Sequence, residues 1–199
     1  MKHPLSIDDV ARALQASDGE ANAIIETLYA SGARVSELVG LTWDDVDWAG
    51  GYVGLQGKGG DARRVPVGRP CLSVLYGLYA AHRSRPGADC RVFNLNEQAI
   101  RDRLKTVGRR IGVHLTPHLL RHAFAGHLHL NGANERVIQE WLGHCRVDTT
   151  ALYLDGCERV IEEKRQLVAR SLAAARGLDA DPRSLKRVIV GDGAGLILR

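Results

Sequence analysis

The chain has 199 residues, 45% of them hydrophobic and 25% charged, with a formal net charge of +4 at pH 7. This composition is typical of one soluble globular domain with a packed core, and the small positive excess is consistent with nucleic-acid binding without establishing it. The first ten residues lack the apolar segment of a signal peptide, no apolar run approaches the roughly 20 residues that span a bilayer, and the four cysteines show no Cys-x-x-Cys spacing. We therefore expect a cytoplasmic protein with reduced cysteines and no membrane partner.

Apolar residues at helical spacing predict helices over about residues 6–16 and 20–30, followed by a short helix that begins after Ser31-Gly32. Arg34 lies at the start of this short helix, where free backbone N–H groups favour an anion. Glu37, three residues on, shares its face and is placed to hold the guanidinium in position. The same two residues also fit a surface ion pair worth less than about 1 kcal/mol.

Residues 52–56 and 62–67 are predicted to be the strands of a hairpin that follows a turn-rich connection over residues 43–48. The glycine-rich turn between the strands presents Lys58 at its tip, where an isolated lysine more commonly serves solubility. The turn lacks the spacing and the Ser or Thr of a P-loop, so ATP binding is not expected.

Two more helices are predicted over about residues 70–82 and 96–111. The polar face of the second helix is basic, and a further basic pair lies in the second strand of the hairpin. Such faces suit a DNA backbone, because phosphate contacts require only positive charge and register, although plain solvation explains them equally well. The candidate DNA-binding residues are Arg63, Arg64, Arg101, Lys105 and Arg109.

Residues 116–155 hold the most informative polar side chains. Thr116 and Pro117 are predicted to begin a helix that ends at Asn131-Gly132, and a second helix over about residues 134–142 is predicted to end at Gly143. These two helices set the positions of the residues that carry candidate chemistry.

Two imidazoles, a guanidinium and a phenol in this stretch suit attack on a phosphodiester. His118 and Arg121 share a helix face, His144 follows the next helix, and Tyr153 comes nine positions later. A guanidinium holds two phosphate oxygens at once, and imidazoles donate to those oxygens or move a proton. The phenol, with an ordinary pKa of about 10, needs such help to become a nucleophile.

A metal site is the competing interpretation of the histidines in this region. His118 and His122 have the i, i+4 spacing of two zinc ligands on a helix, but the metalloprotease pattern needs Glu directly after the first His, where Leu119 stands. We therefore expect no metal, and predict that His122, His127 and His129 are packing or surface residues.

The ordered motifs resemble those of the tyrosine recombinases of the phage-integrase family, and most closely the Xer-type members. That family carries His-x-x-Arg, then Leu-Gly-His, then a nucleophilic Tyr nine residues on. Upstream, residues 31–38 (SGARVSEL) resemble its first-arginine box, and residues 57–67 resemble its lysine hairpin. The matching C-terminal positions here are His118, Arg121, Leu142-Gly143-His144 and Tyr153.

The resemblance implies a mainly α fold with a small antiparallel β-sheet (α+β), the fold of DNA breaking-rejoining enzymes. It also implies site-specific DNA recombination through a 3′-phosphotyrosine, without cofactor or metal, on a double-stranded DNA recombination site. In the family, the hairpin lysine protonates the leaving 5′ oxygen. Glu37 is the supporting residue that its spacing from Arg34 indicates. The implied catalytic residues are Arg34, Lys58, His118, Arg121, His144 and Tyr153.

The resemblance further implies a catalytic domain over residues 1–176. The C-terminal tail over 177–199 has the pattern of a small hairpin, for which the family offers no counterpart. The family's N-terminal core-binding clamp is expected to be absent, either because the sequence is truncated or because the protein is one of the short recombinases. A helix over 160–175 is expected to dock onto a neighbouring protomer in a homotetramer on DNA, with packing in cis as the alternative. Asp155 departs from the family's usual Thr-His after the tyrosine, and its carboxylate opposes DNA binding unless it is paired.

Two other functions remain open at this point. A type IB topoisomerase-like enzyme relaxes DNA with the same chemistry, but the Leu-Gly-His box favours a recombinase. A non-catalytic DNA-binding regulator that kept the fold would have no use for a nucleophile at Tyr153.

Overall fold

The structure, a computed structural model, describes residues 4–57, 60, 62–83 and 90–143. Three predicted catalytic residues, Lys58, His144 and Tyr153, lie outside these described residues, and so do the predicted helix over 160–175 and the tail over 177–199. None of the helices in the described ranges is long and apolar enough to cross a membrane.

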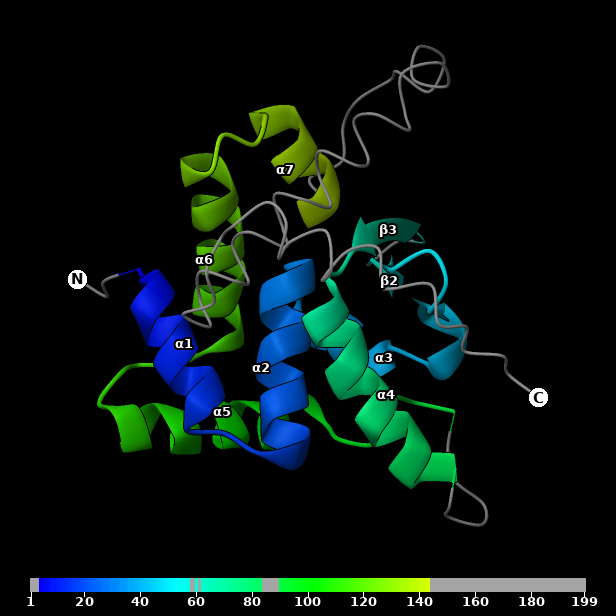
Figure 1. Ribbon diagram of the computed structural model, residues 1–199, viewed down its shortest axis with the longest axis horizontal. Helices are drawn as coiled ribbons and strands as arrows, with labels where there is room; N and C mark the ends of the chain where they lie inside the picture. Colours follow the sequence, from blue (N-terminus) through cyan, green and yellow to red (C-terminus); the bar gives the residue numbers. More distant parts are fainter. Residues whose placement is uncertain (1–3, 58–59, 61, 84–89, 144–199) are drawn as a thin grey trace.

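In the described residues, a first group of helices is followed by a small sheet and then by a second group of helices, in the predicted order (Figure 1). The helices agree with the sequence prediction to within a residue or two at each end. The elements are α1 (Ile7–Gln15), α2 (Gly19–Ser31), α3 (Val35–Gly40), a 3-10 turn (Trp43–Asp45), β1 (Val46–Asp47), β2 (Tyr52–Gln56), β3 (Ala62–Pro66), α4 (Arg69–Arg83), α5 (Glu97–Ile111), α6 (Pro117–Leu130) and α7 (Glu135–Leu142).

α2 is the central helix of the core. Every residue from Ala23 to Ser31 is buried, which is the pattern of a helix covered on all sides. It packs against α1, α4, α5 and α6, and Figure 1 shows it standing between α4 and α6 while α5 crosses its end. Because only residues 32–34 separate α3 from α2, this packing also limits where α3 can begin.

The antiparallel sheet has the order β1-β2-β3 and lies beside the helices, next to α3 and α7. The predicted hairpin of β2 and β3 is confirmed, with Val53 opposite Val65 and Leu55 opposite Arg63. β1 was not predicted as a strand, because two residues are too short to show the alternation of a strand.

Local capping signals place the helix ends as predicted. Ser6 and Asp9 form a capping box at α1, the Thr116 hydroxyl accepts from the backbone N–H of Leu119 at 3.2 Å, and Gly143 ends α7 in a left-handed conformation. The break between α2 and α3 needs glycine for two reasons. Gly32 has φ 62°, and a Cβ there would lie 2.7 Å from Cε1 of Phe124.

Candidate functional site

Glu37 is the centre of an arginine cluster formed by Arg34, Arg63 and Arg121. Its side chain is 2% exposed. Oε1 accepts from Nη1 of Arg34 at 3.0 Å and from Nη1 of Arg63 at 2.7 Å, while Oε2 accepts from the backbone N–H of Arg34 at 2.7 Å and from Nη2 of Arg63 at 2.8 Å. Burial alone would raise the pKa of this carboxyl, but hydrogen bonds from Arg63 and the backbone of Arg34 hold it below its ordinary value. Glu37 is therefore a carboxylate, and it holds Arg34 as predicted.

Arg63 joins β3 to both α3 and α7. Besides its two bonds to Glu37, its Nε donates to the backbone carbonyl of Trp141 at 2.6 Å, and its side chain is only 10% exposed. Arg63 was predicted to contact DNA, but its Nε, Nη1 and Nη2 all donate within the protein. The alternation of side chains along β3 indicated this inward orientation of Arg63, because Val65 lies two residues on, on the same face, and is buried.

Arg121 projects from α6 toward the same cluster and is held by two backbone carbonyls. Its Nη1 donates to the carbonyl of Gly32 at 2.7 Å, and its Nη2 donates to the carbonyl of Leu142 at 2.6 Å. Burial and, after it, the nearby positive charge of Arg34 together lower the pKa of Arg121 to about 10. Among the described residues no carboxylate forms an ion pair with it, so this guanidinium is held in place without being neutralised.

The arginine cluster carries more positive than negative charge. Three guanidinium groups lie around one carboxylate, and after burial the positive charge of Arg34 is the next cause that lowers the pKa of Arg121. An anion bound between Arg34 and Arg121 would relieve the repulsion between them and accept paired hydrogen bonds. The arrangement therefore suits an anion such as a phosphodiester.

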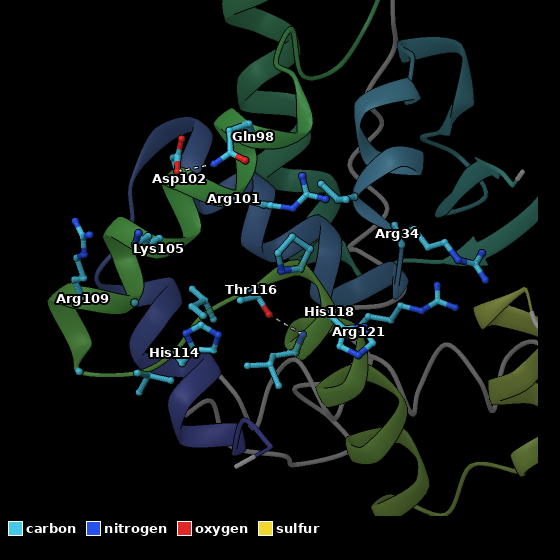
Figure 2. A pocket seen from close by; sticks show the side chains of 18 residues that line it. Arg34, Gln98, Arg101, Asp102, Lys105, Arg109, His114, Thr116, His118 and Arg121 are labelled. Carbon is cyan, nitrogen blue, oxygen red and sulfur yellow. Dashed lines mark hydrogen bonds between the residues drawn. The ribbon is translucent and has the colours of Figure 1, made fainter. Parts of the chain in front are cut away.

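A groove of about 1100 Å³ runs from this cluster along α5 and the start of α6. Figure 2 shows the side chains of Arg34, His118 and Arg121 together at one end, and those of Lys105 and Arg109 toward the other. The groove thus joins the arginine cluster to the basic face of α5 in one continuous surface.

The predicted DNA-binding residues fall into two places. Arg101, Lys105 and Arg109 line the groove, although Arg101 also forms an ion pair with Glu97 at 2.6 Å. Arg64 is not among the groove-lining residues: it forms an ion pair with Asp47 and lies over the ring of Tyr52, 4.9 Å from the ring centroid.

The histidines of α6 differ in their surroundings. His118 is exposed in the first turn, and its Nε2 lies 2.8 Å from Nε2 of His122. His127 is buried between the hydroxyl of Tyr29 and the carbonyl of Leu5, and His129 is exposed, so both are the packing or surface residues that were predicted. The contact between His118 and His122 was not predicted as a hydrogen bond, although their i, i+4 spacing carried the signal. The described ranges contain no group of three or more His, Cys, Asp or Glu side chains placed to hold a metal.

Fold and site together define a mainly helical protein with a small antiparallel sheet and a candidate anion site. The chain belongs to the phage integrase family, whose sequence model matches residues 4–158. It is 40% identical over 161 residues to a protein of Pseudomonas entomophila named tyrosine recombinase XerC, covering 73% of this chain and 54% of that protein. It is 39% identical over 173 residues to tyrosine recombinase XerD of Mycobacterium tuberculosis, covering 75% and 55%.

The solved structures agree with this membership. The crystal structure of XerA recombinase superimposes with a TM-score of 0.69 at 28% identity, covering 82% of this chain and 64% of that one. The predicted family and fold class are thereby confirmed. The chain spans about half the length of the curated relatives it matches.

Proposed function

We propose that this protein is a site-specific DNA recombinase that cuts and rejoins strands through a covalent 3′-phosphotyrosine at Tyr153. The observation that carries the proposal is the arginine cluster, in which Arg34 and Arg121 are held by a carboxylate and by carbonyls at one end of a basic groove. Membership of a family whose relatives are named tyrosine recombinases supports it.

Arg34 and Arg121 bind the non-bridging oxygens of the scissile phosphate. As the phenolate oxygen attacks, negative charge grows on those oxygens, and both guanidinium groups already stand in place to stabilise it. The carbonyls that hold Arg121 and the Glu37 carboxylate that holds Arg34 therefore pre-organise the site. Removing one such donor commonly costs about 10²–10³ in rate.

The proton steps balance without a cofactor. Tyr153 loses its phenolic proton to an imidazole, His118 or His144, as its oxygen forms a bond to phosphorus. The bond from phosphorus to the 5′ oxygen breaks, and Lys58 gives that oxygen its proton. The phosphotyrosine conserves the energy of the phosphodiester, so rejoining by a 5′ hydroxyl needs neither ATP nor a metal.

Double-stranded DNA is the proposed partner, with the α5 face formed by Arg101, Lys105 and Arg109 along its phosphates. We place the catalytic domain at residues 1–176, and we propose a homotetramer on DNA in the cytoplasm, joined through the predicted helix over 160–175. Because phosphate contacts dominate such binding, affinity falls steeply with salt.

The test is to trap the covalent intermediate. The protein is incubated in EDTA with a pool of nicked duplexes of randomised sequence. Cleavage near the nick releases a short strand end that diffuses away, so the strand cannot be rejoined and the protein stays covalently bound to the DNA. An adduct on a denaturing gel that is lost in Tyr153→Phe supports the proposal, and sequencing the trapped strands gives the site. A gel shift without an adduct would point instead to a DNA-binding regulator.

A second measurement separates recombination from relaxation. Duplexes that carry two copies of the recovered site are scored for exchanged junctions, and a supercoiled plasmid for loss of supercoils. Exchanged junctions that require both sites support a recombinase, whereas relaxation without exchange would assign the activity to a type IB topoisomerase-like enzyme.

A further inference from the structure

Two histidines of α6 form a contact that the proposed chemistry leaves unused. The Nε2 atoms of His118 and His122 lie 2.8 Å apart, and the rings meet edge to face with their centroids 4.2 Å apart at 85°. At this distance one nitrogen must carry a proton and the other must accept it, since two bare lone pairs would repel. The pair therefore shares a single proton in the contact.

The surroundings decide which ring accepts. Burial lowers the pKa of His122, and the charges of His118 and Arg121 lower it further. The lowered pKa favours the neutral form of His122, and a neutral imidazole has one nitrogen free to accept. This favours donation from Nε2–H of His118 to Nε2 of His122.

We propose that His122 is a positioning residue that accepts the Nε2 proton of His118 and thereby leaves Nδ1 as the nitrogen of His118 that serves the substrate. This inference rests on the proposed function. Neutral His118 then has its lone pair on Nδ1, where it takes the phenolic proton of Tyr153, and the resulting imidazolium is stabilised by its bond to His122. In rejoining, the same Nδ1–H returns the proton to the phenolate, so the proton balance closes.

A metal ion held by the same pair is the competing explanation, since two imidazoles one helical turn apart chelate zinc or copper. The position argues against a resident cation. Arg121 lies on the same helix, its guanidinium is not neutralised by a carboxylate among the described residues, and its positive charge reaches His122. The hydrogen bond is therefore the assignment that the local charge favours.

The test compares two replacements of His122 with a matched control on the same helix. His122→Gln keeps an acceptor near the position of Nε2, His122→Phe keeps a flat ring without one, and His129→Phe changes an exposed histidine away from the cluster. Circular dichroism first establishes that all three variants are folded. Rates of adduct formation on the recovered nicked duplex, measured in EDTA, then report the chemistry.

The expected result is a fall of about ten- to hundredfold in the adduct rate for His122→Phe at saturating DNA, the size of a lost hydrogen bond to a charged group. His122→Gln recovers most of this loss, and His129→Phe matches the parent protein. Equal loss in both His122 variants, or no loss in either, overturns the inference.

A spectroscopic measurement keeps this test separate from the proposed function. The ring ¹⁵N shifts of His118 in the DNA-free protein report which nitrogen carries the proton. The parent protein is expected to show the Nε2–H tautomer in EDTA, and His122→Phe a mixture of the two tautomers. A parent spectrum with the proton on Nδ1 contradicts the inference even if adducts form, and the Nε2–H tautomer supports it even if no adduct forms.

Discussion

Replacing Glu37 with Gln tests the arginine cluster most directly. The change removes the carboxylate that lies among three guanidinium groups and keeps the size and shape of the side chain. The carboxylate accepts from the backbone and Nη1 of Arg34 and from two nitrogens of Arg63. A Gln oxygen can satisfy one pair of these donors, and its NH₂ group then faces the other pair. Two hydrogen bonds are therefore lost, and one of them belongs to a charge pair that is almost fully buried.

The magnitude follows from the exposure of the two arginines. The Arg63 side chain is 10% exposed beside a carboxylate that is 2% exposed, and breaking such a buried pair costs about 3–5 kcal/mol. The Arg34 side chain is 43% exposed, so water screens its pairing and we count it as a few tenths of a kcal/mol. We expect Glu37→Gln to lower the free energy of unfolding by about 3–5 kcal/mol at pH 7, measured by urea denaturation.

The pH dependence of the free energy of unfolding independently checks whether the Glu37 carboxylate stabilises the folded protein. Because the pKa of Glu37 is lowered in the folded protein, its stabilisation is fully present above the ordinary value of 4.5 and is lost as the pH falls through the folded pKa. The difference in free energy of unfolding between the parent protein and Glu37→Gln should therefore become smaller below pH 4.5. The matched control is Glu97→Gln, which breaks a half-exposed pair on α5 and should cost less than about 0.5 kcal/mol. A Glu37→Gln protein within 1 kcal/mol of the parent at pH 7 would refute this account of the cluster.

Three further variants probe the neighbouring structure. Gly32→Ala should destabilise the protein by about 1–3 kcal/mol in urea, because it forces a side chain into a left-handed residue against Phe124; a stabilised variant would contradict this. Arg121→Lys should slow adduct formation by about 10²-fold or more, since one ammonium cannot span two carbonyls and a phosphate; an unchanged rate would exclude the assigned role. Lys105→Gln should reduce the slope of log affinity against log salt by about 1, whereas Arg103→Gln, whose side chain pairs with Glu20, should leave it nearly unchanged.

The sequence predicted most helix ends because their signals are local. A hydroxyl or amide at the N-cap and a glycine at the C-cap act within one turn, so Thr116, Asn134 and Gly143 identify ends wherever the helix packs. The hairpin was predictable for the same reason, since two alternating segments flank a glycine-rich turn. β1 lacked any such signal, because its two residues become a strand only by pairing with β2.

The candidate site was only partly predictable. The motifs identified Arg34, Glu37 and Arg121, and the i, i+3 spacing alone placed Glu37 against Arg34. The role of Arg63 depends on β3 packing against both α3 and α7, which no local pattern specifies. A basic residue in a strand was therefore interpreted as a DNA contact, although its alternation with Val65 indicated the inner face.

The arginine cluster also fixes the end of α7, which connects it to the residues that follow in the chain. The last carbonyls of a helix have no partner within the helix and carry partial negative charge. Here Arg63 donates to the carbonyl of Trp141, and Arg121 donates to that of Leu142. Gly143 then ends the helix, and His144 is the next residue. The guanidinium groups around Glu37 therefore also hold the last turn of α7, so a change in the cluster acts both on the anion site and on the end of this helix.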